Sequence, residues 1–408
     1  MALALRRQLT RTGEATAMRY LFTTIPGASH MLPLVPLAHA ALAAGHDVLV
    51  AANGSARTTA ASAGLHTVAT DDGRSVRPYD DLVRRFTETD VSWNLTPGEV
   101  IEHVAGVFAE VAGGMADGLV DIARTWKADA VVYCPPAVAG LLAARAAGIP
   151  AVLHGIGTRR PTFRPALNRL APVAERLGAP ALDEAEVEID LSPPSLETIH
   201  QDSPHQGGAR HTLPMRYAPY TGGAELPDWA LRRGDKPRIA VTLGSLRVFY
   251  SDGAHLRDIL KGTEELDVEV VLTTSGAELT ALPSPLPDHV RTVDWMPLRA
   301  LLATCDAIVH HGGMGTMYAA FDAGVPQLGV PMAHDDGWAN AQVPVARGAG
   351  LMLEGRKATG GDIAAALRDL LGEPGYRGAS EEVAAEMRAM PTPADVVREL
   401  PGLLGAAS

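Results

Sequence analysis

The chain has 408 residues, of which 47% are hydrophobic and 20% are charged. This composition is typical of a folded globular protein and excludes a disordered or collagen-like one. Its 35 Lys and Arg residues against 47 Asp and Glu residues give a net charge of −12, which disfavours nucleic acid and anionic membranes as partners. The two cysteines are too few for a disulfide framework, so we expect a cytoplasmic protein.

Residues 1–17 are predicted to be a disordered extension. They contain three arginines but only a five-residue apolar run, which is too short for the hydrophobic region of a secretory signal. The best candidate for a membrane span, residues 34–44, is shorter than the roughly 18 residues required and contains Pro36 and His39. We therefore expect no membrane association and a folded chain that begins at Met18.

From Arg19 onward, short apolar runs alternate with helix-length stretches rich in Ala and Leu. Strands are predicted at residues 20–25, 48–52, 130–133 and 151–154, and helices at residues 33–44 and 137–147, each followed by a glycine. Strands that alternate with helices form parallel sheets. Residues 18–216 are therefore predicted to form one doubly wound α/β domain.

A second α/β domain is predicted after a linker. Residues 217–236 contain two prolines and three glycines without a sustained periodicity, as is typical of a linker. Further strands are predicted at residues 239–243, 268–273, 290–293, 307–310 and 327–330. Residues 237–390 then form the second domain, and residues 391–408 a C-terminal helix that packs back on the first. Two such domains place a ligand-binding cleft between the carboxyl ends of their sheets.

Residues 308–316, Ile-Val-His-His-Gly-Gly-Met-Gly-Thr, read as a strand that runs into a glycine-rich turn and a helix start. A helix N-terminus attracts anions through its exposed N–H groups, and glycines let a phosphate approach the backbone. His310 would add a side-chain donor and Thr316 a hydroxyl group. The segment is neither a Walker loop nor a complete dinucleotide fingerprint, so it predicts a phosphate site of another class.

This segment resembles the donor-binding motif of the family 1 glycosyltransferases of the GT-B fold, in particular the bacterial enzymes that decorate natural products. The resemblance covers nearly the whole chain from Met18 and is strongest over residues 290–350. It implies two Rossmann-like parallel-sheet domains that face each other across a cleft, the first binding the acceptor and the second the nucleotide-sugar donor. It also implies that His310 contacts the diphosphate, whereas His311 matches a variable position. The residues implied beside His310 are Gly312, Gly313, Met314, Gly315 and Thr316.

A further segment resembles part of the family's donor site, and a second segment is a candidate phosphate contact from the chemistry of its residues alone. The turn at Trp295, Met296 and Leu298 resembles the Trp-x-Pro turn that holds the nucleotide base, and the indole face would stack on a pyrimidine; the alternative is that Trp295 belongs to the core. Gly244 and Ser245 follow the first strand of the second domain, where they would meet a phosphate oxygen.

Asp335 and Asp336 lie where the family carries its acidic sugar-reading motif. Carboxylates there accept hydrogen bonds from sugar hydroxyls and so discriminate between sugars. Many glucosyltransferases have Asp-Gln at this place, and the departure favours a TDP-deoxysugar donor over glucose. The alternative is a solvated acidic turn.

Residues 25–33 resemble the family's Gly-His-x-x-Pro loop, with Ser29 in place of the glycine, and His30 matches the general base. An imidazole with a pKa near 6.5 can accept a proton from an acceptor hydroxyl at neutral pH. The carboxylate that often pairs with this base is replaced by Cys134. Three possibilities follow: His30 works alone, Asp335 or Asp336 reaches across the cleft, or the acceptor is as acidic as a phenol.

The resemblance implies an inverting transfer of a deoxysugar to a hydroxyl of a large apolar aglycone in antibiotic biosynthesis. The sugar nucleotide would be a co-substrate, with no cofactor and no metal ion, and no His spacing indicates a zinc site. Phe86, Trp93, Phe108 and Phe163 would suit such an aglycone. The acidic run at residues 184–188 is expected on the solvated surface.

The first strand and the run at residues 390–395 resemble enzymes that glycosylate enediyne antibiotics such as calicheamicin, which implies a rhamnose donor. Two other functions stay open. A nucleotide-sugar epimerase has the same two-domain outline but needs no acceptor, and a catalytically silent partner would bind the nucleotide without releasing sugar. The sequence also leaves a monomer and a homodimer open.

Overall fold

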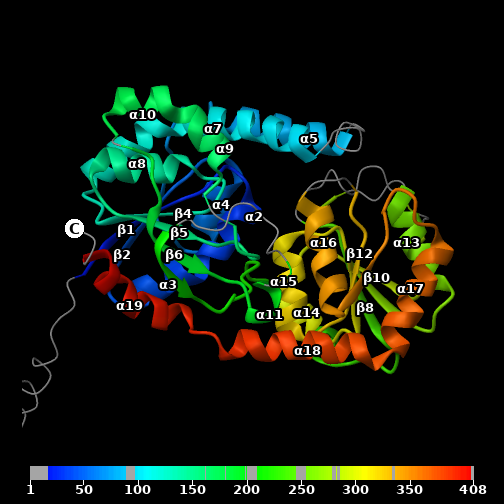
Figure 1. The fold of residues 1–408 in the computed structure, drawn as a ribbon. Helices are drawn as coiled ribbons and strands as arrows, with labels where there is room; N and C mark the ends of the chain where they lie inside the picture. Colours follow the sequence, from blue (N-terminus) through cyan, green and yellow to red (C-terminus); the bar gives the residue numbers. More distant parts are fainter. Residues whose placement is uncertain are drawn as a thin grey trace, which may run out of the picture.

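The computed structural model describes residues 17–88, 97–160, 162–179, 181–197, 199, 209–244, 254–277, 282, 285–332 and 336–405. The predicted N-terminal extension lies outside these residues, apart from Ala17. Two α/β domains lie side by side and are joined by a linker (Figure 1). No helix in the described part of the chain is long and apolar enough to cross a membrane.

The first domain is built on a parallel sheet with the strand order β3-β2-β1-β4-β5-β6-β7. Its strands are β1 (Arg19–Thr23), β2 (Asp47–Ala51), β3 (Thr67–Val68), β4 (Ala130–Tyr133), β5 (Ala151–His154), β6 (Ala185–Asp190) and β7 (Ala209–Pro214). Its helices are α2 (Ala28–Met31), η1 (Leu32–Leu34), α3 (Val35–Ala43), α4 (Gly54–Ser62), α5 (Val76–Glu88), α7 (Pro97–Thr125), α8 (Ala139–Ala147), α9 (Arg164–Leu167), η2 (Asn168–Leu170), α10 (Ala171–Leu177) and α11 (Pro194–Glu197). Helices α7, α8 and α10 cover one face of this sheet and α3 the other (Figure 1).

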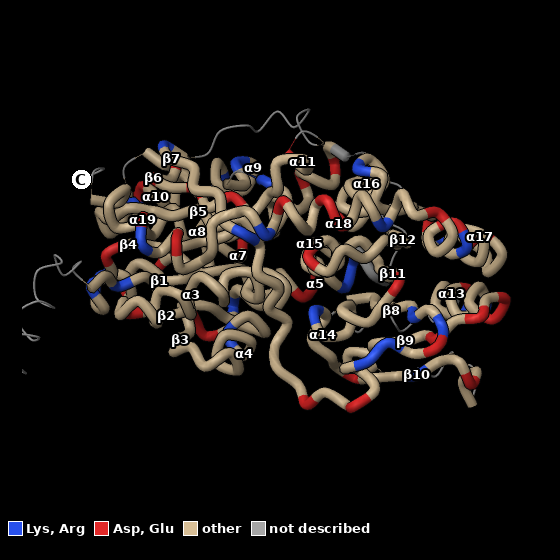
Figure 2. Tube along the Cα trace, turned by 90° about the horizontal axis from the view of Figure 1, so that it is seen from below, with Lys and Arg blue, Asp and Glu red and all other residues tan. Residues whose placement is uncertain are grey.

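The second domain has the sheet order β10-β9-β8-β11-β12-β13, also parallel. Its strands are β8 (Arg238–Thr242), β9 (Glu269–Thr273), β10 (Val290–Val293), β11 (Ala307–His310), β12 (Gln327–Gly329) and β13 (Gly350–Met352). Its helices are α13 (Ala254–Glu264), α14 (Leu298–Leu302), α15 (Met314–Ala323), α16 (Asp336–Arg347), α17 (Gly360–Gly372) and α18 (Pro374–Ala389), and η4 (Asp228–Leu231) lies in the linker. Acidic and basic residues are interspersed over both domains (Figure 2).

The predicted fold class is confirmed. The strands predicted from apolar runs agree with β1, β2, β4 and β5 in the first domain and with β8 to β12 in the second to within two residues. Except for the partly exposed edge strand β10, these strands are mainly apolar because helices cover both faces of each sheet. Tyr20, Phe22 and Tyr133 are fully buried in the core of the first domain, and Val241 and Val309 are fully buried in that of the second.

The expectation that residues 184–188 lie on the solvated surface is wrong, because they enter the buried strand β6. Glu186 and Glu188 are only 6% and 3% exposed. A carboxylate oxygen of Glu186 accepts from Arg145 Nη1 at 3.1 Å and from the Ala151 amide at 2.7 Å. Glu188 forms a two-point pair with Arg159, at 3.0 and 2.7 Å. Buried carboxylates are tolerated when paired in this way.

The chain passes between the domains a second time at its C-terminal end. Helix α18 runs beneath the second domain, and α19 (Pro393–Gly405) packs against α3, β6 and β7 of the first domain (Figure 1). The start of α19 is capped by the pair Thr392 and Asp395, whose side chains each accept from the other's backbone amide. The Arg216 amide, next to the linker, donates to Pro391 O at 2.7 Å, so the two crossings are hydrogen-bonded to each other.

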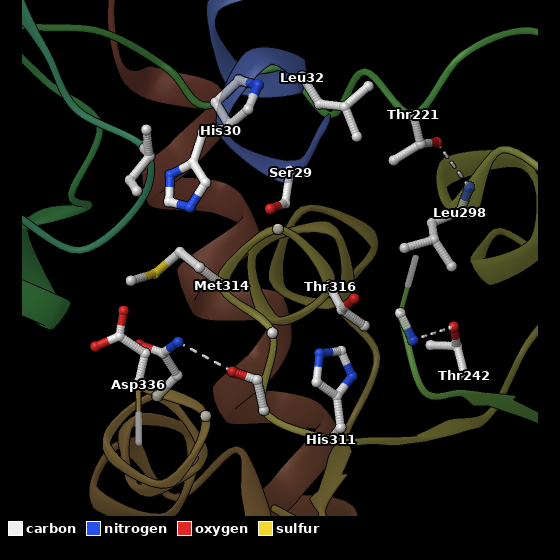
Figure 3. Close-up of a pocket in the computed structure, with 18 of the residues that line it drawn as sticks. Ser29, His30, Leu32, Thr221, Thr242, Leu298, His311, Met314, Thr316 and Asp336 are labelled. Atoms are coloured by element: carbon white, nitrogen blue, oxygen red, sulfur yellow. Dashed lines mark hydrogen bonds between the residues drawn. The ribbon is translucent and has the colours of Figure 1, made fainter. Parts of the chain in front are cut away.

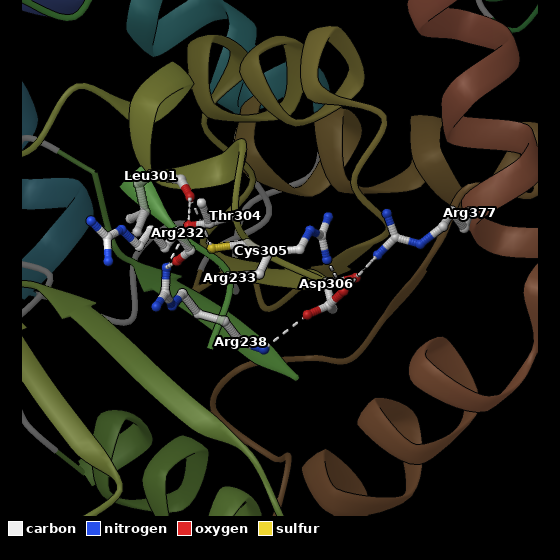
Figure 4. A network of polar contacts seen from close by, with 8 residues as sticks. All are labelled: Arg232, Arg233, Arg238, Leu301, Thr304, Cys305, Asp306 and Arg377. Carbon is white, nitrogen blue, oxygen red and sulfur yellow. Dashed lines mark hydrogen bonds and ion pairs between the residues drawn. The ribbon is translucent and has the colours of Figure 1, made fainter. Parts of the chain in front are cut away.

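A polar network holds the end of the second sheet that lies away from the cleft. Asp306, directly before β11, accepts from Arg233 Nη1 at 2.6 Å and from the Arg238 amide at 2.9 Å. Arg377 of α18 donates to the Asp306 carbonyl oxygen at 2.9 Å (Figure 4). One carboxylate therefore connects the linker, β8 and β11, and Arg377 of α18 also lies 3.4 Å from its Oδ1.

Candidate functional site

A cavity of about 280 Å³ lies between the carboxyl ends of the two sheets. Its first-domain wall includes Ser29, His30 and Arg160, and the linker contributes Tyr217 and Tyr220. Its second-domain wall is formed by the glycine-rich turn, the start of α15, the start of α16 and the loops after β8 and β10 (Figure 3). The cavity is therefore lined by residues far apart in sequence, as expected for a cleft between parallel sheets.

The glycine-rich turn joins β11 to α15 and faces this cavity. Gly312 has a φ of +91°, and a Cβ built there would lie 2.0 Å from the carbonyl oxygen of Gly337, so only glycine fits between the turn and α16. Gly313 is the N-cap of α15. Gly315 and Thr316 in the first helical turn also line the cavity. The first N–H groups of a helix have no partner within it, and here they lie at the cavity wall.

The structure contradicts the role predicted for His310. Its ring is fully buried, with Nε2 3.0 Å from Gln327 Oε1 and Nδ1 accepting from the Gly312 amide at 3.1 Å. Successive residues of a strand point to opposite sides, and it is the neighbour, His311, that lines the cavity. Burial lowers the pKa of His310 to about 3 and that of His311 to about 4. Both rings are therefore neutral at pH 7.

The loop predicted to hold the nucleotide base also lines the cavity. Trp295 is 43% exposed, so it is not a core residue, and its indole Nε1 donates to Thr221 O at 2.8 Å. The Leu298 amide donates to Thr221 Oγ1 at 3.1 Å (Figure 3). Met296 and Gly244 line the same wall, whereas Ser245 lies outside the described residues. The linker thus fixes the position of this loop.

His30 lies in the short helix α2 on the opposite wall of the cavity. Its ring Nδ1 has no hydrogen-bond partner among the described residues. Burial lowers the pKa of His30 to about 4, the charge of Asp336 acts to raise it, and that of Arg160 acts to lower it. The imidazole is therefore neutral at pH 7 and able to accept a proton.

Cys134 does not take the place of a carboxylate partner for His30. It is fully buried at the end of β4, and its Sγ lies 3.2 Å from Thr24 Oγ1. Burial raises the pKa of this thiol to about 11, so it carries no negative charge at neutral pH. The charge that acts on His30 from across the cleft is that of Asp336.

Asp336 is the first residue of α16, and Asp335 lies outside the described residues. Arg160 Nη1 donates to Asp336 Oδ1 at 2.8 Å, and this guanidinium lowers the pKa of the carboxyl group. No local pattern marked Arg160, because its partners lie 176 and 180 residues away in the chain. Met314, predicted to contact the donor, also touches the first domain: its Sδ accepts from the Thr158 amide and hydroxyl at 3.4 and 3.3 Å.

The aromatic residues predicted for the acceptor are only partly described. Phe108 and Phe163 stack edge to face, with ring centroids 5.8 Å apart, and pack against the core. The side chain of Phe86 and the whole of Trp93 lie outside the described residues. No group of three His, Cys, Asp or Glu side chains within the described ranges is placed to hold a metal ion.

Comparisons with known proteins agree with this geometry. The N-terminal and C-terminal domain models of erythromycin biosynthesis protein CIII-like proteins match residues 39–244 and 257–403. The elloramycin glycosyltransferase ElmGT of Streptomyces olivaceus is 37% identical, with 94% of this chain and 97% of the relative covered. The solved structure of the glycosyltransferase SnogD from Streptomyces nogalater has a TM-score of 0.80 at 38% identity and covers 95% of this chain and 100% of its own.

The spinosyn rhamnosyltransferase SpnG complexed with thymidine diphosphate has a TM-score of 0.78 at 28% identity and covers 94% of this chain and 100% of its own. SpnG has also been solved with the spinosyn aglycone. The named relatives are transferases of antibiotic biosynthesis, which does not favour an epimerase. The chain therefore belongs to the erythromycin biosynthesis protein CIII-like family of GT-B glycosyltransferases, which act in antibiotic biosynthesis.

Proposed function

We propose that this glycosyltransferase moves a deoxysugar, rhamnose or a close relative of it, from a TDP-sugar to a hydroxyl of a large apolar aglycone such as an enediyne. The supporting observation is the cavity itself, in which His30 of the first domain and the glycine-rich start of α15 form opposite walls (Figure 3). A base on one wall and an anion site on the other suit a displacement at the anomeric carbon.

The diphosphate of the donor is proposed to lie at the N-terminus of α15. The backbone N–H groups of that helical turn and the positive end of its dipole would bind phosphate oxygens. His311 and Thr316 line the same wall, so we assign to His311 the role that the sequence predicted for His310. Because charge develops on the diphosphate as it leaves, these fixed donors stabilise the transition state more than the ground state. The proposal includes no metal ion.

The nucleotide base and the sugar of the donor are proposed to occupy the two ends of the second-domain wall. The exposed indole of Trp295 offers a stacking surface for thymine. Asp336, with Asp335, would accept hydrogen bonds from the sugar. Support for thymidine diphosphate comes from its complex with SpnG, and support for rhamnose from that enzyme's name, while other relatives are named for other deoxysugars.

In the proposed reaction, His30 takes the proton of the acceptor hydroxyl while that oxygen attacks the anomeric carbon. The new bond between oxygen and carbon forms as the bond to the diphosphate breaks, and TDP leaves with the electron pair. The imidazolium that forms at His30 is stabilised by the negative charge of Asp336 across the cleft. With a pKa of about 4 in the free protein, His30 is a weak base, which favours a phenolic or similarly acidic acceptor.

The test begins with titration of the purified protein with TDP and UDP. TDP-rhamnose and other TDP-deoxysugars are then incubated with and without a panel of aglycones that includes an enediyne. We expect tighter binding of TDP than of UDP, and release of TDP together with a glycosylated aglycone. If neither nucleotide binds, the donor assignment fails; if the sugar nucleotide is altered without an acceptor, an epimerase replaces the proposal.

Two histidine variants control this test. His30→Ala removes the proposed base, whereas His39→Gln changes a histidine outside the cavity, whose ring bonds to Ala63 O at 2.8 Å. We expect His30→Ala to bind TDP normally but to lose turnover, and His39→Gln to keep both. Full turnover by His30→Ala would overturn the assignment of the base while leaving the donor site intact.

A further inference from the structure

The loop after β5 carries two consecutive arginines that bond in opposite directions. Arg159 is held entirely within the first domain, by Glu188 of β6 and by Thr212 of β7, the latter at 3.2 Å. Arg160, the next residue, reaches across the cleft to α16 of the second domain. Arg159 thus anchors the loop on the sheet, so that Arg160 can extend toward the other domain.

The guanidinium of Arg160 contacts two residues of α16 at once. Nη1 lies 2.8 Å from Asp336 Oδ1, and Nη2 lies 3.3 Å from Asn340 Oδ1. Asn340 is only 3% exposed, and its amide Nδ2 donates to Gly312 O at 3.0 Å. Arg160 of the first domain therefore contacts the carboxylate of Asp336 directly. Through Asn340 it is also connected to the glycine-rich turn.

The same loop has a second contact with the turn. The Thr158 amide and hydroxyl donate to Met314 Sδ, and Met314 is the first residue of α15. The Arg160 contacts and the Thr158 contacts both join the first domain to the second, so they exist only when the cleft has its present width. A wider cleft would break all of them together.

We propose that Arg160 is a positioning residue, which couples closure of the cleft to alignment of Asp336 with His30 and the donor sugar. This inference rests on the proposed transferase function. The guanidinium holds one oxygen of Asp336 and leaves the other for the sugar or for the charge on His30. Arg160 lines the same cavity, but the groups it orients are Asp336 and, through Asn340, the turn at Gly312.

The inference predicts a particular kinetic result for Arg160→Met. This change keeps an unbranched apolar side chain but removes the guanidinium and with it both contacts, and we expect kcat to fall by about 10- to 100-fold, the size of a lost charged hydrogen bond. The affinity for TDP alone should change less than about threefold, since the proposed diphosphate contacts lie within the second domain. Arg160→Lys can restore the single contact to Asp336 but not the two-point one, so it should recover part of kcat.

The matched control is Arg176→Met, which removes an exposed arginine paired with Asp117 inside the first domain. It should leave kcat and the melting temperature unchanged. A cycle with Asp336→Asn tests the coupling: the double variant Arg160→Met, Asp336→Asn should lose little more than Asp336→Asn alone. The inference would be overturned if the kcat losses of the two single variants multiplied in the double variant. It would also be overturned if Arg160→Met had a kcat within twofold of that of the parent. Failure of the parent enzyme to turn over any TDP-sugar would instead count against the proposed function.

Discussion

Replacing Gly312 by alanine should damage both the stability of the second domain and its proposed phosphate site. At a φ of +91° an L-residue is strained by about 1–2 kcal/mol. The new Cβ would lie 2.0 Å from Gly337 O and 2.7 Å from the Gly337 carbonyl carbon, where non-bonded atoms prefer about 3.5 Å. Because these neighbours are backbone atoms, the turn and α16 must separate.

Separation also threatens the hydrogen bond from Asn340 Nδ2 to Gly312 O, which is 3.0 Å long and contributes about 1 kcal/mol. Strain and the lost hydrogen bond together give about 2–3 kcal/mol, which corresponds to roughly 4–12 °C in the melting temperature of a domain of this size. We expect TDP binding to weaken as well, because the turn no longer presents its amides in one arrangement.

Calorimetric melting with and without TDP measures both effects, and Gly315→Ala is the matched control. A Cβ at Gly315 would lie 3.4 Å from Tyr217 Oη, an ordinary contact, and alanine is the better helix former in the first turn of α15 by up to about 1 kcal/mol. Gly315→Ala should therefore melt no lower than the parent, but bind TDP more weakly, since its methyl group faces the cavity. An unchanged melting temperature and TDP affinity in Gly312→Ala would refute this reasoning.

Three further predictions concern catalysis, the donor base and pH. His30→Gln should lower kcat by about 10²- to 10⁴-fold with an unchanged Kd for TDP; steady-state kinetics and a binding titration check this, and a loss confined to Kd would contradict it. Trp295→Ala should raise the Kd for TDP by about 5- to 150-fold, equivalent to 1–3 kcal/mol of stacking, and should leave the Kd for inorganic pyrophosphate nearly unchanged in parallel titrations. Burial lowers the pKa of His30, His154 and His311 to about 4 in the folded state, against 6.5 in the unfolded chain. Between pH 6.5 and 4 the unfolded state therefore binds more protons than the folded state. The free energy of unfolding is thus highest above pH 6.5 and falls as the pH drops through this window. The decrease is up to about 1.4 kcal/mol per pH unit for each histidine. Denaturant unfolding at pH 7, 5.5 and 4.5 measures this slope, and a constant free energy across the window would contradict it.

The two-domain fold could be predicted from sequence because most strands are buried on both faces and are therefore uniformly apolar. Strand β6 escaped prediction because Glu186 and Glu188 alternate with its apolar residues, a pattern that normally marks exposure. Their burial depends on Arg145 and Arg159, which are 41 and 29 residues away. Local composition carries no information about such partners.

The parts of the candidate site that lie within one sequence segment could be predicted. Contacts between segments that are far apart in the sequence could not. The glycine-rich turn was located correctly, but the choice between His310 and His311 depends on which side of β11 each residue faces, and the motif alone did not reveal that. Arg160 bonds to Asp336 and Asn340 across 176 and 180 residues, so only the packing of the two domains brings these side chains together.

The two chain crossings between the domains are joined by the hydrogen bond from the Arg216 amide to Pro391 O, so the two connections lie next to each other. Adjacent connections oppose separation of the domains at that point, whereas the contacts of Arg160 with Asp336 and of Thr158 with Met314 are the ones that a wider cleft would break. Under the proposed function, an acceptor too bulky for the present cleft would separate Arg160 from Asp336, so the size of the acceptor would become a condition for aligning the donor.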